Sequence, residues 1–407
     1  MAMRHRFGRH ELSVDRMELS TDGVARPLEP QVFDLLRLLA ESGGRVVSRD
    51  ELIDKVWGGR IVSDSAIDAR ISAARAALGD DGTRQEFIRT VPRRGFRFVA
   101  PVETDAGGAR PLPAPAAEAP GQRQRVMFCH SRDGTRIALA TSGAGLPLVK
   151  AGHWLTHLEH DWQSPIWRPF LAALGERFHL VRYDQRGNGL SDRAVANFSL
   201  DAFVADLEAA VDAAGVDGFT LYGASQGAPI AIAYAARHPG RVARLVLQGG
   251  YHKGRLVRMA AAEREQGEAM LTLIRHGWGK PDSPFMQAFS SIFMPEASRE
   301  QIASFASLQS LTTTPENAAL LRKAIDEFDV TALLERIEVP TLVLHSRGDG
   351  VQPLDQGREI AAGIRGAEFV MLDTSDHIIV PGNRAWDELI GAIAGFAEAR
   401  PAVRPAP

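Results

Sequence analysis

The segment FTLYGASQGAPIAIAYAARHP, residues 219–239, decides the fold of the larger part of this chain. An apolar run from Phe219 to Tyr222 leads directly into the pattern G-x-S-x-G, and an alanine-rich stretch with helical character follows it. A strand, a tight turn and a helix would place Ser225 at the tip of the turn, with its hydroxyl exposed above a sheet. Gly223 and Gly227 fit this interpretation, because a side chain at either position would clash in so strained a turn. The segment therefore predicts a serine nucleophile on an α/β sheet.

The size and composition of the chain indicate two globular domains in a reducing compartment. At 407 residues the chain is longer than one ordinary domain. Its net charge is only −3, and its single cysteine, Cys129, excludes an internal disulfide and a multi-cysteine metal site. There is no apolar signal core, and no apolar run reaches the roughly 18 residues of a membrane span. We expect a cytoplasmic protein that does not contact a membrane.

Shifts in composition divide the chain into four parts. Residues 1–100 form the first predicted domain, and residues 101–124, rich in Pro, Ala and Gly, read as a linker. From residue 125 to 396, short apolar strands alternate with helical stretches, which predicts a mostly parallel sheet with helices on both faces. The remainder, residues 397–407, is expected to be disordered.

The first domain contains three helical patterns followed by a basic hairpin. The first helix begins near Pro30, and Ser48 with Glu51 forms a capping box that opens the second. The third carries an apolar stripe at helical spacing, formed by Ile67, Ile71, Ala74 and Leu78. Two strands follow, and their turn carries the basic side chains of Arg93, Arg94 and Arg97. This order of elements describes a winged helix-turn-helix, whose helix enters the major groove while its wing touches phosphates.

The first domain resembles the OmpR/PhoB-type DNA-binding domain over residues 8–100, through VVSRDELIDKVW, RISAARAALGDD and TVPRRGFRFV. The resemblance implies an α+β winged helix that binds double-stranded DNA, with residues 63–78 as the recognition helix and Arg70 and Arg75 as candidate contacts. Asp64 and Asp68 depart from this picture because they place negative charge on or near that helix. The alternative is a winged helix used for protein contacts.

A serine nucleophile needs a base, and the base needs an orienting acid. Asp349 follows the strand PTLVLHS, and His377 follows the strand EFVMLD. Both lie where an open α/β sheet binds its ligands, beyond the carboxyl ends of the strands. The loop after the intervening strand contains no acid, so Asp349 is the best candidate.

Residues 125–396 resemble the α/β-hydrolase superfamily, with VRYDQRGNGLSDR (182–193) and DGVQP (349–353) as further matching segments. The resemblance implies Ser225 as nucleophile, His377 as base and Asp349 as its orienter. The oxyanion hole would be formed by the backbone N–H groups of Gln226 and His153. The family commonly has His-Gly in the loop that supplies the second donor, whereas this chain has Ala151-Gly152 before His153. The departure bears on the rate of any reaction, since losing one such donor lowers the rate about 10²–10³-fold.

A helical cap is expected over residues 251–335, between two strands of the sheet. Within it, the aromatic stripe of Phe285, Phe289 and Phe293 either packs the cap onto the main domain or lines an apolar pocket together with Trp154. No cofactor fingerprint is present, so we expect no cofactor. The spacing of His153, His157 and His160 would allow a metal site, but a structural role at the pocket mouth is the preferred interpretation.

These patterns favour a cytoplasmic transcriptional regulator. Its winged helix would bind double-stranded DNA, and its hydrolase-like domain would sense, and in one version hydrolyse, a small apolar ester, lactone or related carbonyl compound. Two alternatives stay open: a working serine hydrolase that its winged helix only recruits or regulates, and a catalytically silent receptor. A homodimer is expected because winged helices of this type often bind as pairs on tandem half-sites.

Overall fold

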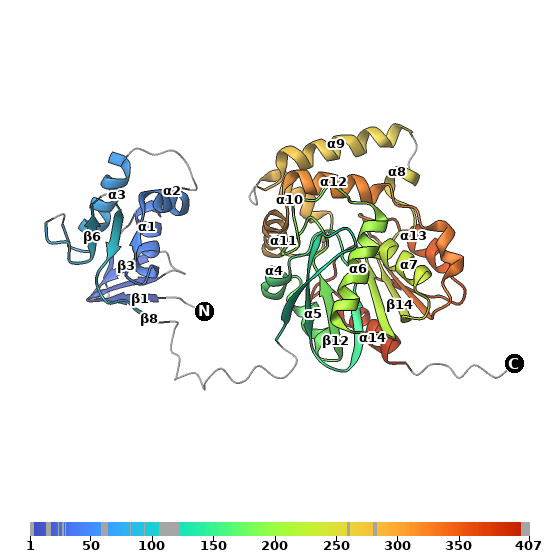
Figure 1. Ribbon diagram of the computed structural model, residues 1–407. Helices are drawn as coiled ribbons and strands as arrows, with labels where there is room; N and C mark the ends of the chain where they lie inside the picture. Colours follow the sequence, from blue (N-terminus) through green and yellow to red (C-terminus); the bar gives the residue numbers. More distant parts are fainter. Residues whose placement is uncertain are drawn as a thin grey trace. The chain divides into compact units, whose positions relative to one another are not determined.

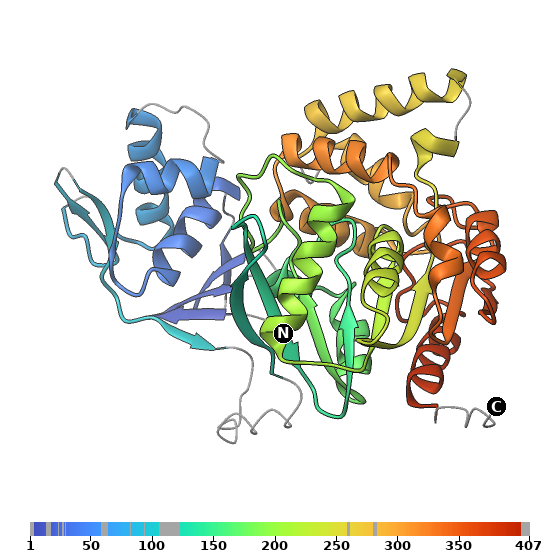
Figure 2. The same ribbon diagram turned by 45° about the vertical axis from the view of Figure 1, so that its right-hand side comes forward.

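The computed structural model describes residues 4–13, 18–22, 24–26, 28, 30–57, 64–81, 83–92, 94–105, 123–258, 261–279 and 283–399 (Figures 1 and 2). The chain divides into two compact units, residues 1–116 and 117–407, each with its own apolar core. Arg93 and most of the segments 101–124 and 397–407 lie outside the described residues.

The N-terminal unit opens with an antiparallel sheet in the order β4-β3-β2-β1-β8. Its last strand follows the winged helix and pairs with the first, so the unit extends beyond the boundary that the sequence predicted at residue 100. The prediction ended too early because a short polar strand has no apolar pattern of its own. The strands are β1 (Arg4–Phe7), β2 (His10–Ser13), β3 (Glu18–Thr21), β4 (Val24–Arg26) and β8 (Glu103–Asp105).

Three helices and a small hairpin complete this unit, as the sequence predicted. The Ser48 hydroxyl accepts a hydrogen bond from the Glu51 N–H at 3.1 Å, which caps the second helix. The predicted stripe of the third helix is buried in full and joins Leu36 and Phe96 in the core. The elements are α1 (Pro30–Glu41), α2 (Arg49–Trp57), α3 (Asp64–Ala77) and the three-stranded sheet of β5 (Val46–Val47), β7 (Gly95–Phe98) and β6 (Ile88–Val91).

The C-terminal unit is built on an eight-stranded sheet in the order β16-β15-β14-β13-β11-β12-β10-β9. The sheet is parallel from β12 to β16, and β10 pairs antiparallel with both of its neighbours. Its strands are β9 (Arg125–His130), β10 (Arg136–Ser142), β11 (Leu146–Lys150), β12 (Phe178–Tyr183), β13 (Phe219–Ala224), β14 (Val242–Gln248), β15 (Thr341–Ser346) and β16 (Glu368–Leu372).

Helices cover both faces of this sheet, which gives the two apolar layers of an α/β fold. One layer lies under α6 (Leu200–Ala214), α7 (Gly227–Arg237) and α13 (Leu354–Gly363). The other lies under α5 (Arg168–Gly175) and α14 (Trp386–Glu398), so the last helix runs past residue 396 into the predicted tail. A short helix, α4 (Leu158–Gln163), precedes α5.

The predicted cap is a group of helices between β14 and β15. Helices α9 and α12 pack side by side at one end of this unit in both views (Figures 1 and 2). The cap comprises α8 (Arg255–Arg258), α9 (Ala261–Gly277), α10 (Pro284–Ser291), α11 (Arg299–Thr312) and α12 (Pro315–Asp326), and the 3₁₀ turn η1 (Thr331–Arg336) leads back to the sheet. Over the described part of the chain, no helix is both long and apolar enough to cross a membrane.

Candidate active site

Ser225 lies in the sharp turn between β13 and α7 that the sequence predicted. Its φ is +52°, a left-handed value that costs a side-chain-bearing residue roughly 1–2 kcal/mol. The turn is held from below, since the Ser225 N–H donates to the Gln248 carbonyl of β14 at 2.9 Å. Such stored strain is typical of a residue whose side chain must be presented to a ligand.

The two glycines of the motif fit the space that this turn leaves. A Cβ on Gly223 would lie 2.6 Å from the Gly227 carbonyl oxygen, which no real contact allows. A Cβ on Gly227 would lie 3.0 Å from the carbonyl oxygen of Gly152, in the loop after β11. The glycines therefore let the serine turn close and let the neighbouring loop approach it.

Asp349 and His377 form a buried pair beyond the carboxyl ends of β15 and β16. The His377 Nδ1–H donates to Asp349 Oδ2 at 2.6 Å, while Asp349 Oδ1 accepts from the N–H groups of Val351 and Gln352 at 2.8 and 2.9 Å. Burial acts to raise the pKa of Asp349, but His377 and these hydrogen bonds outweigh it, so the pKa lies below its ordinary value. The ionised carboxylate fixes the proton on Nδ1 and leaves Nε2 as the basic ring nitrogen.

Gly249 is a residue of this site that the sequence interpretation missed. Its φ is +54°, and a Cβ there would lie 3.1 and 3.2 Å from Cε1 and Nδ1 of His377. The signal was present as Gly249-Gly250 at the end of β14. Only the folded structure shows that this glycine makes room for the imidazole.

The predicted oxyanion donors, the N–H groups of Gln226 and His153, are held together by a side chain from a third loop. Gln185 Oε1 accepts from Gln226 Nε2 at 2.8 Å, and Gln185 Nε2 donates to the His153 and Trp154 carbonyls at 3.0 and 3.3 Å. The structure shows no partner for either of the two N–H groups among the residues it describes. Gln185 lies in the family-like segment 182–193, but its bridging role could not be predicted from it.

The His153 ring lines the site as a neutral aromatic group and not as a charged one. It lies 4.6 Å from the ring of Trp167, measured between centroids. Burial, reinforced by Lys150 and His377, lowers the pKa of His153 well below its ordinary value. The other two histidines of the loop do not join it: His157 caps α4 by accepting from the His160 N–H at 3.4 Å.

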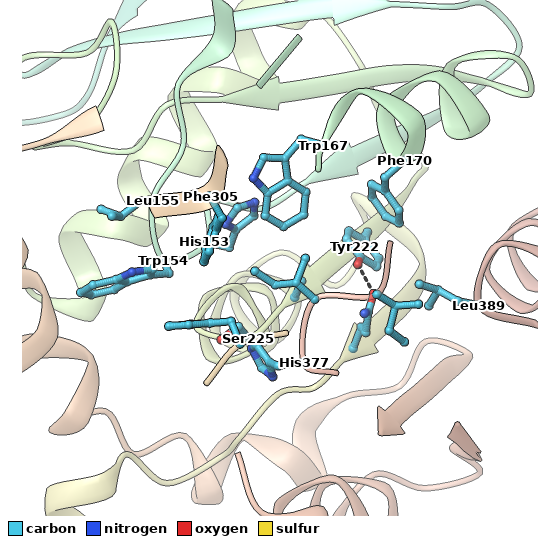
Figure 3. Close-up of a pocket in the computed structure, with 15 residues that line it drawn as sticks. His153, Trp154, Leu155, Trp167, Phe170, Tyr222, Ser225, Phe305, His377 and Leu389 are labelled. Carbon is cyan, nitrogen blue, oxygen red and sulfur yellow. Dashed lines mark hydrogen bonds between the residues drawn. The ribbon is translucent and has the colours of Figure 1, made fainter. Parts of the chain in front are cut away.

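Ser225 and His377 open into one cavity of about 40 Å³ (Figure 3). One water-sized group needs about 10–15 Å³, so this volume leaves room for more than one. The wall is mostly apolar and includes the predicted pocket residues Trp154 and Phe293. The other lining residues are His153, Leu155, Trp167, Phe170, Tyr222, Ala224, Gln248, Phe305, Ile378, Ile379 and Leu389.

Phe285 and Phe289, which the sequence placed at the pocket, lie outside its lining. Phe289 packs on Phe285 at 5.6 Å and on Trp278 at 6.0 Å between ring centroids, inside the cap. The stripe is therefore mainly a packing surface, and only its last member, Phe293, reaches the cavity. Residues four apart share a helix face, but the pattern cannot show where that face meets the cavity.

The cap is fastened to the histidine loop. The N–H groups of His377 and Ile378 both donate to the Phe293 carbonyl, at 2.9 and 3.0 Å. Nearby, Asp376 Oδ1 accepts from the Glu296 N–H at 2.8 Å, and Glu296 Oε1 accepts from the Ser375 N–H at 2.6 Å. These bonds fix the backbone of the histidine loop against the end of α10.

The predicted DNA contacts divide into two groups. Arg75 points inward: its Nε and Nη2 atoms donate to the Ile88 carbonyl at 3.0 and 2.8 Å, and it is buried, so its assignment as a DNA contact was wrong. It lies beside the apolar stripe of α3, where the sequence could not separate inward from outward positions. Arg94 and Arg97 are exposed in the hairpin, and Arg70 is half-buried on α3.

The comparisons with known proteins separate the chain into the same two parts. The family described as "alpha/beta hydrolase fold" matches residues 159–383, more than half of the chain, and "Transcriptional regulatory protein, C terminal" matches residues 23–98. The transcriptional activator CadC of Escherichia coli is 42% identical over 86 residues, 21% of this chain and 17% of CadC.

Relatives of the C-terminal part have lower sequence identity than CadC, but they match a larger share of this chain. Pyrrolizixenacetamide deacetylase of Xenorhabdus hominickii is 26% identical over 251 residues, which are 61% of this chain and 87% of that protein. An esterase from Exiguobacterium antarcticum has the same fold with a TM-score of 0.57 at 20% identity, covering 68% of this chain and 100% of its own. The chain therefore belongs to the α/β-hydrolase fold family and carries at its N-terminus a winged helix-turn-helix of the transcriptional-regulator type.

Proposed function

We propose that this chain is a cytoplasmic transcriptional regulator that binds double-stranded DNA through its N-terminal unit and binds and hydrolyses a small apolar ester or lactone in its C-terminal unit. The observation that carries the hydrolytic part is the convergence of Ser225, at a left-handed φ, with the hydrogen-bonded pair of Asp349 and His377 around one apolar cavity. These are the parts that an activated serine needs.

In the proposed reaction His377 Nε2 accepts the proton of the Ser225 hydroxyl as its oxygen attacks the carbonyl carbon of the substrate. The Gln226 and His153 N–H groups stabilise the negative charge that develops on the carbonyl oxygen. His377 then gives the proton to the leaving alkoxide, and an acyl group stays on Ser225. Water, deprotonated by the same histidine, releases this acyl group as a carboxylic acid. Asp349 keeps the imidazole in the required tautomer throughout.

The proposed substrate class follows from the cavity wall and from the relatives. Most lining side chains are apolar, and they include no lysine or arginine over the part of the chain that the structure describes. The similar proteins include esterases, an enol-lactonase and a deacetylase. A small, uncharged ester or lactone is the substrate that best suits such a wall.

The DNA-binding part of the proposal rests on the family match and on the similarity to CadC and to the cholera toxin transcriptional activator of Vibrio cholerae. We assign the phosphate and base contacts to Arg70 on α3 and to Arg94 and Arg97 in the hairpin, with Arg93 as a fourth candidate outside the described residues. A homodimer on tandem half-sites belongs to the same proposal. Ligand binding shifts DNA affinity only through contacts that differ between two states.

Labelling with a fluorophosphonate tests the hydrolytic part. Fast, single-site modification of Ser225 that is lost in Ser225→Ala and His377→Ala would support an assembled triad, and a panel of esters and lactones would follow. A folded protein that binds DNA but resists labelling would overturn catalysis and favour a silent receptor. Robust turnover without a defined operator sequence would instead favour a hydrolase that the winged helix only recruits.

A further inference from the structure

We propose that the Gln248 side-chain amide makes this site selective for acyl groups that carry a second, uncharged carbonyl oxygen along their chain. The inference rests on the proposed hydrolase function and names its substrate class more narrowly. It follows from the residues that line the cavity and from one buried hydrogen bond in its wall.

One side of the cavity is bounded by the core beneath the strand ends. Phe170, Tyr222, Ile379 and Leu389 line it, and all four belong to the apolar layer between the sheet and helices α5 and α14. Figure 3 shows Ser225 and His377 at one side of the pocket and Phe170, Tyr222 and Leu389 farther along it. An apolar chain attached to the reacting carbonyl can therefore extend into this layer.

Gln248 places a polar group on this side of the cavity wall, and its backbone lies directly beside the serine turn. It pairs with Ala224 in the register of β13 and β14, and its carbonyl accepts from the Ser225 N–H at 2.9 Å. Its side chain lines the cavity together with Tyr222. Because the amide is bonded to the Tyr222 hydroxyl, a group that binds it would lie on the acyl chain, on the Tyr222 side of the cavity.

The neighbouring phenol fixes which end of the amide faces the cavity. The buried Tyr222 hydroxyl donates to Gln248 Oε1, and the structure shows no other acceptor for that hydrogen among the residues it describes. The opposite orientation would leave the single phenol hydrogen unsatisfied in an apolar layer, which is costly. The Gln248 Nε2 group keeps two hydrogens, for which no protein acceptor is found among the described residues.

A free amide donor in an apolar cavity favours one kind of ligand. An all-apolar acyl chain would cover the N–H groups and leave them unsatisfied, whereas a chain with a carbonyl oxygen beside them would accept their hydrogen bond. Among the described residues the lining holds no lysine or arginine, which argues against a carboxylate at this point. An oxoacyl ester such as a 3-oxohexanoate fits these requirements because its acyl chain carries a second, uncharged carbonyl oxygen.

The test compares ethyl 3-oxohexanoate with ethyl hexanoate, followed by acid release at constant pH. We expect kcat/KM to favour the oxo ester by about 10- to 100-fold in the natural protein, from the usual cost of burying an unpaired donor. Gln248→Met should remove this preference, and Tyr222→Phe should reduce it because the amide is then free to turn. Gln356→Met, a buried glutamine on α13 outside the cavity lining, is the matched control and should leave the ratio unchanged.

A natural protein without the preference, or a Gln248→Met variant that keeps it, would overturn the inference. If neither ester is turned over, binding of both to Ser225→Ala is measured by thermal shift. A matching preference in binding that Gln248→Met removes would support the inference while the hydrolase proposal fails. Equal binding of the two esters would overturn the inference by itself.

Discussion

Replacing Gly249 by alanine separates two costs that usually occur together. Gly249 has a φ of +54°, and a Cβ there would lie 3.1 Å from His377 Cε1 and 3.4 Å from Asp349 Oδ2. Gly215, which ends α6 with a φ of +64°, has no atom of a described residue within 4 Å of the corresponding position. Gly215→Ala therefore introduces the backbone strain alone, and Gly249→Ala introduces the same strain together with a collision against the histidine.

Both variants should lower the free energy of unfolding by roughly 1–2 kcal/mol, the cost of a left-handed conformation in a residue with a side chain. Only Gly249→Ala should also slow the reaction. To relieve the contact, the imidazole must move by a few tenths of an ångström, and a displacement of about 1 Å in an active site can cost about 10² in rate. We expect about a tenfold decrease in labelling of Ser225, which corresponds to roughly 1.4 kcal/mol in the activation free energy.

Urea unfolding followed by tryptophan fluorescence gives the first quantity, and the rate of fluorophosphonate labelling gives the second. A Gly249→Ala variant that labels at the natural rate would refute the argument that this glycine reserves space for His377. Slow labelling in Gly215→Ala would refute it as well, since the effect would then follow from general destabilisation.

Three further outcomes are expected. Asp349→Asn should slow labelling of Ser225 by about 10⁴, because an amide stabilises the wrong tautomer of the histidine; a loss below tenfold would contradict the assigned role. Burial, with Asp206 and Asp212 nearby, raises the pKa of Cys129 to about 11, so iodoacetamide at pH 8 should modify it about 100-fold more slowly than a thiol with an ordinary pKa of 9, and equal rates in native and urea-unfolded protein would contradict this. Arg75→Ala should destabilise the N-terminal unit by about 2–3 kcal/mol, because its buried hydrogen bonds are lost, and melting curves measure this. Arg94→Ala should leave the stability unchanged but reduce the salt dependence of DNA binding by about one charge, which binding titrations at several salt concentrations measure.

Local patterns were enough to predict the framework of both units. The alternation of strands and helices, the serine turn and the stripe on α3 are short-range signals, because each depends on a period or a spacing within one element. Asp349 and His377 could be chosen because the carboxyl ends of parallel strands meet at one edge. The structure brings this pair to 2.6 Å.

The features that the sequence could not supply are contacts between distant segments. Gln185 bridges the serine turn and the loop after β11, and Gly249 yields to a histidine that lies more than a hundred residues away. Arg75 was assigned to DNA because basic residues on a recognition helix usually face outward, whereas its partners lie in the hairpin. Phe289 shares its face with Phe293, but only the fold shows that Trp278 covers it.

The two hydrogen bonds from the histidine loop to the Phe293 carbonyl have a consequence for engineering. Through these bonds the cap holds the backbone of His377 in place. Removing α9 to α12 to admit bulkier ligands would therefore remove part of the support of His377. A protein without these helices would have a more open cavity, but Ser225 would also become less reactive. Enlarging the cavity is better attempted from the opposite wall, at Leu389, where α14 can be redesigned without touching the backbone that carries the base.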